Sequence, residues 1–377
     1  MFKNFWWPLE FSHVVGNKPA RLHALGQDFV IYRKTDGAPQ VMSDLCIHRG
    51  GALSGGWTKG DCIVCPYHGW EYKADGECAR IPANLPGVAV PKRARVDAYP
   101  TQEKYGFVWA FLGDIPENER PPMPVFPEFD DANYKIITGE FKWDANYERV
   151  CENALDAAHA AFVHGGVFGN PDEPEIEDFA VEQDDYSIGA TLYLKSTPSK
   201  GLWGRVFGSQ KEPVPTKTRP GFMMPCITTL AVDMPLGKMR LFDVNLPIDE
   251  NTTLTKWVSF RTFFKGRWAD GDARKRIQRI FDQDHVIVSG QRPELVPFDL
   301  NAELHVRSDA MQVAYRKMRK RFIDRGWGID AHRIEIDANR KFTVIPSPAR
   351  RGNPELAHAW VMKETPIVQN TSGDLAS

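Results

Sequence analysis

The chain of 377 residues has no apolar run that approaches membrane-spanning length, and its mean hydropathy is −0.40. It also lacks a large excess of either charge: the formal net charge of −2 gives no electrostatic reason to expect a nucleic-acid partner. The opening segment Met1–Phe11 is too rich in tryptophan and polar residues to be a secretion signal. Cysteine is scarce, with six in the chain, which suits a reducing compartment. These absences predict a cytoplasmic protein without a nucleic-acid or membrane partner.

Two short metal-ligand pairs stand out in the first fifth of the chain. They are Cys46-Ile47-His48 and Cys65-Pro66-Tyr67-His68, and each offers one thiolate and one imidazole. Two such pairs can hold a [2Fe–2S] cluster, with both sulfur ligands on one iron and both histidines on the other. Glycines follow both pairs, in Gly50-Gly51 and Gly69-Trp70. The spacing therefore predicts an iron–sulfur centre.

A structural zinc site is the alternative. Cys62 and Cys65, together with Cys46 and His48, would form a Cys₃His set. However, Asp61–Cys65 is typical of a short strand, which would point Cys62 away from Cys65, and zinc would leave His68 without a role. The iron–sulfur interpretation is therefore favoured. Three scattered cysteines are expected to be ordinary buried residues, namely Cys78, Cys151 and Cys226.

A second motif is Asn153-x-x-Asp156-x-x-His159, followed by His164. Two imidazoles and one carboxylate can occupy one face of a ferrous ion and leave its other positions open. His159 and His164 lie roughly 140° apart on an ideal helix, too far to share one face. The helix must therefore end, loosen or bulge between them, and Gly165-Gly166 offers that release.

Together the two motifs resemble the terminal oxygenase (α) component of the Rieske non-haem iron oxygenases. The resemblance implies one [2Fe–2S] cluster and one Fe(II) per subunit, with His159 and His164 as ligands of the Fe(II). Asp156 would be the catalytic link between the metals, hydrogen-bonded to His159 and to the partner subunit's His68. Asn153 and Trp70 would lie next to the metal-binding residues and support them without binding metal themselves. The implied fold is an N-terminal all-β Rieske domain over residues 1–120, followed by an α+β helix-grip (START-like) catalytic domain over residues 121–377.

The family supplies one further iron ligand, a carboxylate, from a later helix. An apolar stripe of Ile277, Ile280/Phe281 and Val288 has helical spacing, and Asp284 falls within it. A carboxylate on the core-facing row costs several kcal/mol unless a cation compensates for it. The stripe therefore favours Asp284 as the ligand. Asp282 and His285 are expected in solvent, although Val286 and Ile287 widen the apolar surface and keep Asp282 open as the alternative.

The resemblance also implies a function and its partners. The enzyme would activate dioxygen and hydroxylate or demethylate an aromatic or other ring compound, with ring cis-dihydroxylation as the alternative. The chain contains no dinucleotide fingerprint, flavin motif or plant-type ferredoxin cysteine set, so electrons would come from NAD(P)H through a separate ferredoxin and/or flavin reductase. Electron transfer between chains would require a head-to-tail ring, most simply a homotrimer. Candidate residues for an apolar substrate cavity are Phe162, Phe168, Trp203, Phe207, Phe222 and Met223.

Two other classes of protein are alternatives. An electron-transfer Rieske protein would need only the residues up to about 120, and the second motif argues against it. A zinc-binding structural module would have no visible colour.

The expected secondary structure agrees with two domains, because helices are predicted only after the proline-rich stretch 115–127. Strands before it are predicted at Asp28–Arg33, Gln40–Ser43, Asp61–Cys65, Trp70–Lys73, Glu77–Ala79, Ala94–Tyr99 and Phe107–Leu112. Strands after it are predicted at Ile136–Trp143, Ala180–Asp184, Ser187–Leu194, Ile227–Val232, Met239–Val244 and Thr253–Phe264. Helices are predicted at Glu148–Val163, Gly271–Ser289 and Ser308–Arg325, the last with Ser308 as its N-cap and Arg316–Arg321 on its solvated side.

Overall fold

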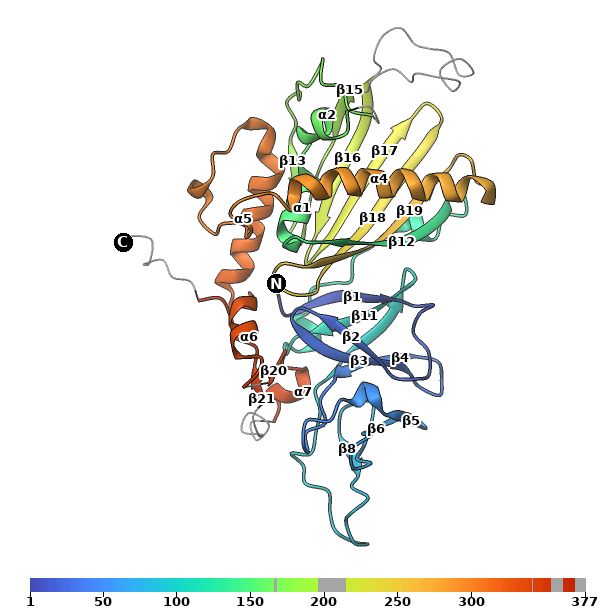
Figure 1. The fold of residues 1–377 in the computed structure, drawn as a ribbon, viewed down its shortest axis with the longest axis vertical. Helices are drawn as coiled ribbons and strands as arrows, with labels where there is room; N and C mark the ends of the chain where they lie inside the picture. The colour runs from blue at the N-terminus through green and yellow to red at the C-terminus, as the bar shows by residue number, and fades with distance from the viewer. Residues whose placement is uncertain (166–167, 196–214, 341, 354–361, 370–377) are drawn as a thin grey trace. The chain divides into compact units, whose positions relative to one another are not determined.

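A computed structural model describes residues 1–165, 168–195, 215–340, 342–353 and 362–369 (Figure 1). The chain divides into two compact units. The first comprises Met1–Pro124, Ile248–Glu250 and Phe322–Ser377, and the second comprises Val125–Pro247 and Asn251–Arg321. Within the described residues, no helix has the length and apolar character needed to cross a membrane. The expected order of an all-β part followed by an α+β part is confirmed.

The N-terminal part of the first unit contains three antiparallel sheets. Their strand orders are β1 (Phe5–Phe11), β11 (Phe107–Leu112), β10 (Thr101–Lys104); β2 (Ala20–Ala24), β3 (Gln27–Arg33), β4 (Pro39–Ser43), β9 (Ala98–Tyr99); and β5 (Trp57–Lys59), β6 (Cys62–Val64), β7 (Glu71–Tyr72), β8 (Cys78–Arg80). The first ligand pair follows β4, and the second lies between β6 and β7. Side chains from β3, β4, β6 and β7 share one core, which includes Tyr32, Met42, Ile63 and Tyr72. That core supports both ligand loops.

The C-terminal segment packs with this first unit. It contains α6 (Ala331–Asp337), α7 (Pro348–Arg351) and the parallel pair β20 (Phe342–Val344) and β21 (Met362–Glu364). The buried Asp97 carboxylate accepts hydrogen bonds from Arg350 Nε at 3.0 Å and Ser347 Oγ at 2.8 Å. Tyr99 Oη donates to the Ile345 carbonyl oxygen at 2.7 Å. The range 121–377 thus includes a segment that packs elsewhere, and its assignment to one catalytic domain stays a prediction.

The second unit is built on an antiparallel sheet of order β12-β19-β18-β17-β16-β14-β13, with β15 beside β16. The bounds are β12 Lys135–Trp143, β13 Val181–Gln183, β14 Ser187–Ala190, β15 Leu192–Lys195, β16 Pro215–Met223, β17 Ile227–Met234, β18 Gly237–Pro247 and β19 Thr253–Arg261. The expected strand Ser187–Leu194 is divided into β14 and β15, which both pair with β16. The last pair of β14 is Gly189 with Gly221, and the first pair of β15 is Leu192 with Thr218. Between Thr218 and Gly221 lies Pro220, which has no N–H to donate to the ladder.

A long helix, α4 (Asp270–Val288), lies across one face of this sheet (Figure 1). Its buried row of Ile277, Phe281 and Val288 packs against Trp143 and Trp257 from the strands. The shorter α1 (Tyr147–Leu155) contacts β16, β17 and β18. The sheet and these helices enclose the core of the unit, as expected of a helix-grip arrangement.

The expectation that Arg316–Arg321 lies on a solvated helix face is wrong for three residues, since Arg316, Met318 and Arg319 are buried. In α5 (Ala310–Asp324), Arg316 and Arg319 are 5% and 3% exposed. Arg319 Nε donates to Glu148 Oε1 at 2.8 Å, and Arg316 Nη2 donates to Glu152 Oε2 at 3.0 Å. These buried pairs join α5 to α1. The helix also begins later than expected, since Ser308 lies in a 3-10 turn (Arg307–Asp309) before it.

Candidate metal centres

The two ligand loops of the first unit close in the same way. The Cys46 N–H donates to Gly51 O at 2.8 Å and the Gly50 N–H donates to Cys46 O at 2.9 Å. In the second loop the Cys65 N–H donates to Trp70 O at 2.9 Å and the Gly69 N–H donates to Cys65 O at 3.0 Å. Gly50 and Gly69 have φ of 71° and 70°, a left-handed conformation that favours glycine. The glycines after each pair thus fold both ligand sets into matching turns.

The ligand side chains are arranged with sulfur inside and nitrogen outside. Cys46 and Cys65 are 2% and 1% exposed, whereas His48 is half-buried and His68 is exposed. The two imidazole ring centroids lie 4.6 Å apart, and Trp70 stacks on His48 at an interplanar angle of 7°. His48 Nδ1 is buried without a hydrogen-bond partner among the described residues. Two inner thiols and two outer imidazoles form a donor set that fits a [2Fe–2S] cluster.

The electrostatics of this site suit bound metal. Burial raises the pKa of the Cys46 thiol to about 11, although a contact with Tyr72 Oη and the His48 backbone N–H oppose the rise. Tyr72 Oη lies 3.1 Å from Cys46 Sγ and can donate to the thiolate. Burial, and then the charges of His68 and Arg49, lower the pKa of His48, which favours the neutral imidazole that binds metal. At neutral pH the Cys46 thiolate therefore needs a bound cation.

The geometry does not favour the zinc alternative. A mononuclear zinc site needs its ligand atoms close together. Among the described residues, one group of three or more metal-binding side chains has its ligand atoms within 4.8 Å of one another. That group is His159, His164 and Asp284, so Cys62 is not gathered with Cys65, Cys46 and His48. Cys62 lies half-buried on β6, one residue after Asp61.

The second centre is formed where the predicted helix Glu148–Val163 is interrupted. α1 ends at Leu155, Asp156 caps it in an extended conformation, and a separate short helix, α2, spans His159–Val163. His164 follows as the C-cap of α2, with φ of −98° and ψ of 21°. The expected departure from helical geometry between His159 and His164 is confirmed, and a second break precedes His159. As a result both rings turn toward α4.

Three ligand atoms converge there. His159 Nε2 and His164 Nε2 are 3.2 Å apart, and Asp284 Oδ1 lies 3.5 Å from the first and 3.3 Å from the second. Metal bonds of about 2.1 Å at roughly 90–110° place ligand atoms about 3.0–3.4 Å apart. Asp284 Oδ1 is also buried without a hydrogen-bond partner among the described residues. Both observations fit a divalent metal held by these side chains.

Neighbouring groups orient the two histidines. His164 Nδ1 lies 3.1 Å from Gln283 Oε1, and when that nitrogen donates, Nε2 is left free to bind metal. Burial alone would lower the pKa of His164, but Asp284 raises it overall through a hydrogen bond and its charge. Asp284 therefore stabilises a cation at this position, whether the cation is a proton or a metal ion.

Asp156 lies beside His159 but at a longer distance than expected for a hydrogen bond. Its Oδ2 is 3.8 Å from His159 Nδ1, which has no hydrogen-bond partner among the described residues, and its Oδ1 accepts from the Ala158 N–H at 2.8 Å. Asp156 and Asn153 also line a polar pocket of about 160 Å³, together with Arg149, Glu152, Gln291, Glu303, Leu304, His305, Asp309, Gln312 and Arg316. Asp156 is therefore placed to orient His159 while its side chain reaches solvent.

The neighbours of Asp284 on α4 differ from it in burial. Asp284 is 5% exposed on the row of Ile277, Phe281 and Val288, whereas Asp282 is exposed and accepts a hydrogen bond from Gln278. Val286 and Ile287 are exposed at 70% and 47%. His285, expected in solvent, is half-buried with its ring centroid 5.8 Å from that of Phe141. The apolar stripe thus gives the inward direction to within one residue.

The predicted cavity residues are dispersed. Phe168 lies against His164, with ring centroids 4.7 Å apart, whereas Phe162 is 66% exposed. Phe222 is a core residue packed on Tyr315 of α5. Trp203 and Phe207 lie outside the described residues. Of the described candidates, Phe168 is the one that lies at the metal centre.

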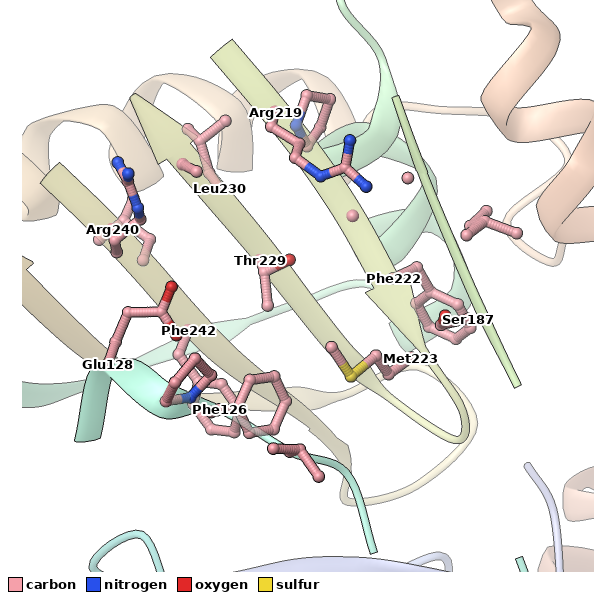
Figure 2. Close-up of a pocket in the computed structure, with 18 of the residues that line it drawn as sticks. Phe126, Glu128, Ser187, Arg219, Phe222, Met223, Thr229, Leu230, Arg240 and Phe242 are labelled. Carbon is pink, nitrogen blue, oxygen red and sulfur yellow. The ribbon is translucent and has the colours of Figure 1, made fainter. Parts of the chain in front are cut away.

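Met223 and Phe222 also border a pocket of about 500 Å³ on the second unit, which Figure 2 shows. Phe126, Phe242 and Thr229 line it, with Arg219 and Arg240 at one end. None of His159, His164 and Asp284 lines this pocket. In Figure 2 the long helix lies behind the strands that carry these residues, so the pocket is on the opposite face of the sheet from α4.

Sequence reasoning missed Gln283 and Tyr72, although each stands near a predicted ligand. Gln283 directly precedes Asp284, and Tyr72 lies on β7, shortly after His68. Gln283 on α4 contacts His164, and Tyr72 contacts Cys46 of the other ligand loop. The spacing of residues in one sequence does not reveal such contacts.

Comparisons with known proteins agree with this geometry. Two family descriptions match: the Rieske [2Fe-2S] domain over residues 6–100, and the vanillate O-demethylase oxygenase C-terminal domain over residues 143–325. Methylxanthine N1-demethylase NdmA of Pseudomonas putida is 29% identical over 333 residues, which cover 84% of this chain and 87% of the relative. Methylxanthine N3-demethylase NdmB of the same organism is 25% identical, with 84% and 88% covered.

Solved structures give the same result. The structure of Pseudomonas putida NdmA with caffeine superimposes with a TM-score of 0.71 at 26% identity, covering 84% of this chain and 90% of that one. Dicamba monooxygenase bound to 3,6-dichlorosalicylic acid gives a TM-score of 0.71 at 22% identity, which supports the fold alone. The first matched region contains both ligand loops, and the second contains His159, His164 and Asp284.

Proposed function

This chain belongs to the Rieske non-haem iron oxygenases as a terminal oxygenase component, and we propose that its reaction is the oxidative demethylation or hydroxylation of a ring compound. The family uses a [2Fe–2S] cluster and a mononuclear Fe(II). The observation that most directly supports the proposal is the convergence of His159, His164 and Asp284, whose ligand atoms all lie within 4.8 Å of one another. A protein that only transferred electrons would have no use for this second centre.

Demethylation is favoured over ring cis-dihydroxylation. The second family description is that of an O-demethylase, and two of the relatives are N-demethylases. In such a reaction a methyl group on oxygen or nitrogen is released as formaldehyde, which carries one oxygen atom of dioxygen, while two electrons and two protons reduce the other oxygen atom to water. The oxygen or nitrogen atom that carried the methyl group then carries a hydrogen atom. A ring dihydroxylation would instead leave both oxygen atoms of dioxygen on the product.

The residues of this chain divide the work between the two centres. We assign Cys46, His48, Cys65 and His68 to the cluster, and His159, His164 and Asp284 to the Fe(II). When bound, these cofactors supply electron storage and the activation of dioxygen. Gln283 holds His164 in one orientation through the 3.1 Å contact at Nδ1. Asp156 is close enough to His159 to fix its ring by a small movement of either side chain.

A product assay tests the reaction. Holoenzyme supplied with a reductase, NAD(P)H and a panel of N-methyl and O-methyl ring compounds should release formaldehyde in proportion to the dioxygen consumed. Asp284→Ala protein, which should retain the cluster, is the matched control and should release none. Products that carry two added hydroxyl groups, without formaldehyde, would instead support dihydroxylation.

Electron delivery is the second part of the proposal. We propose that a separate ferredoxin and/or flavin reductase reduces the cluster, and that copies of the chain form a head-to-tail homotrimer in the cytoplasm. In that ring Asp156 would face the partner subunit's His68 and carry the electronic connection. Asp156→Asn should keep both metals and yet lose most substrate oxidation after the cluster is reduced, whereas Asp282→Asn should keep it. Full single-turnover activity in Asp156→Asn, or a monomer in sedimentation, would contradict this part alone.

A further inference from the structure

Asp243 is a buried carboxyl group on β18 that no step proposed above uses. Along this strand, Leu241 and Asn245 lie on the same face as Asp243, since side chains alternate. Leu241 packs into the core beneath α4. Asn245 Nδ2 lies 3.7 Å from Cys151 Sγ of α1. The Asp243 side chain therefore faces the side of the sheet that α1 and α4 cover.

The metal centre lies on this same side. Asp284 occupies the buried row of α4 that packs toward the sheet, and His159 and His164 reach it there. The residues directly opposite Asp243 are Thr228 on β17 and Trp257 on β19, and both are uncharged. Trp257 belongs to the core under α4, and Thr228 is tied by Asn245 to the α1 side. Asp243 thus lies on the covered face of the sheet, flanked by Trp257, which packs in the core with α4 residues, and by Thr228, which Asn245 connects to α1.

One carboxyl oxygen of Asp243 has no hydrogen-bond partner in the part of the chain that the structure describes. This oxygen, Oδ1, is buried, and the residue is 9% exposed. Thr228, the residue opposite Asp243 on β17, accepts a hydrogen bond from the Asn245 amide at 2.9 Å, and no hydrogen bond from its hydroxyl to Asp243 Oδ1 is formed. Burial alone raises the pKa of Asp243 to about 8, so near neutrality the group is an uncharged carboxylic acid. A buried acid without a partner destabilises the fold, which is the usual mark of a group held for a ligand.

We propose that Asp243 is the polar anchor for the substrate of this oxygenase, and that it selects an uncharged ring with an N–H next to a carbonyl. This inference rests on the proposed function and adds the substrate class to it. A neutral carboxyl group offers one O–H donor and one carbonyl acceptor side by side. A lactam edge offers the complementary acceptor and donor, so the two form a pair of hydrogen bonds.

Other substrate charges fit this position less well. An anionic substrate would need a cation opposite it, and neither Thr228 nor Trp257 supplies one. A cationic substrate would require Asp243 to ionise in a site where burial disfavours the charged form. A lactam requires neither a buried charge nor a change of protonation.

Binding to the holoenzyme tests this assignment with probes that share one bicyclic skeleton. The probes are 2-quinolone, naphthalene, quinoline-2-carboxylate and N-methylquinolinium, measured by titration calorimetry. Wild-type protein should bind 2-quinolone most tightly. Asp243→Asn keeps a donor beside an acceptor, so its affinity should stay within about threefold, whereas Asp243→Leu should bind at least about tenfold more weakly. Thr229→Val, which changes the pocket on the opposite face, should leave the affinity unchanged.

Each contrary result identifies a different error. Binding of 2-quinolone no tighter than naphthalene, including no detectable binding of either, overturns the assignment. So does equal affinity in wild type and Asp243→Leu, which would mean that a water molecule is the partner of Asp243. Tightest binding of N-methylquinolinium, lost in Asp243→Asn, would mean an ionised anchor for a cation. In all three cases a holoenzyme that still couples reduction to oxygen consumption with another substrate leaves the proposed function standing.

Discussion

Replacing Asp243 by asparagine is expected to stabilise the protein near neutral pH, and the gain should grow as the pH rises. Burial raises the pKa of this carboxyl group to about 8 in the folded chain, from an ordinary value of 3.8. Between these values the unfolded chain has released the proton and the folded chain keeps it, so each pH unit favours unfolding by about 1.4 kcal/mol. The free energy of unfolding of wild type is therefore unaffected by this group below about pH 4 and falls as the pH rises toward about 8.

The size of the effect follows from that slope. Between about pH 5 and pH 7.5 wild type should lose up to about 3 kcal/mol relative to Asp243→Asn, because the amide does not titrate. This is an upper limit, since local opening of the strand admits water to the charged form. For domains of about 150–250 residues it corresponds to a change in the Tm difference of up to roughly 6–12 °C.

Thermal unfolding of both proteins in the same buffers measures how the Tm difference between Asp243→Asn and wild type changes with pH. Contributions from all other titrating groups cancel because both proteins share them. The variant should melt above wild type at neutral pH, and the two curves should approach each other in acid. A Tm difference that is constant across this pH range would mean that Asp243 is ionised in the folded protein. The burial and substrate arguments built on it would then both fail.

Three further predictions concern the cluster and the support of α1. Cys62→Ser should keep the red-brown colour and the absorption spectrum of the cluster, and a colourless protein would favour the Cys₃His zinc set instead. Tyr72→Phe removes a donor 3.1 Å from Cys46 Sγ, so the reduction potential in a redox titration should fall, and an unchanged potential would contradict that contact. Arg319→Met leaves the buried Glu148 carboxylate without its cationic partner, which should cost about 3–5 kcal/mol of unfolding free energy, whereas Arg276→Met at the exposed pair with Asp272 should cost less than about 1 kcal/mol; equal losses would refute the distinction.

Local sequence pattern predicted those parts of the molecule that depend on neighbours along the chain. The glycines after each ligand pair determine two turns of the same form, and both glycines adopt the left-handed conformation that those turns need. The apolar row of α4 pointed inward at Asp284, and the structure places that carboxylate beside both histidines. In each case the feature is determined by interactions among residues of a single turn or a single helix face, which are close together in the sequence.

Other features depend on partners that are distant in sequence, and no local pattern reveals them. The arginines of α5 read as a solvated face because their partners, Glu148 and Glu152, lie more than a hundred residues earlier. The return of the C-terminal segment to the first unit depends in the same way on Asp97 and Arg350. Asp243 has the alternating pattern of an ordinary strand residue, and the lack of a hydrogen-bond partner for its Oδ1 among the described residues becomes visible only when both neighbouring strands are in place.

The central claim is that Asp284, with His159 and His164, holds the iron at which the substrate reacts. Metal analysis of anaerobically purified Asp284→Ala and Asp282→Ala, together with cluster absorbance, tests it most directly. We expect Asp284→Ala to lose the mononuclear iron, keep the cluster and show no turnover, while Asp282→Ala keeps both metals and most activity. Loss of the mononuclear iron in Asp282→Ala, with the iron retained in Asp284→Ala, would contradict the account.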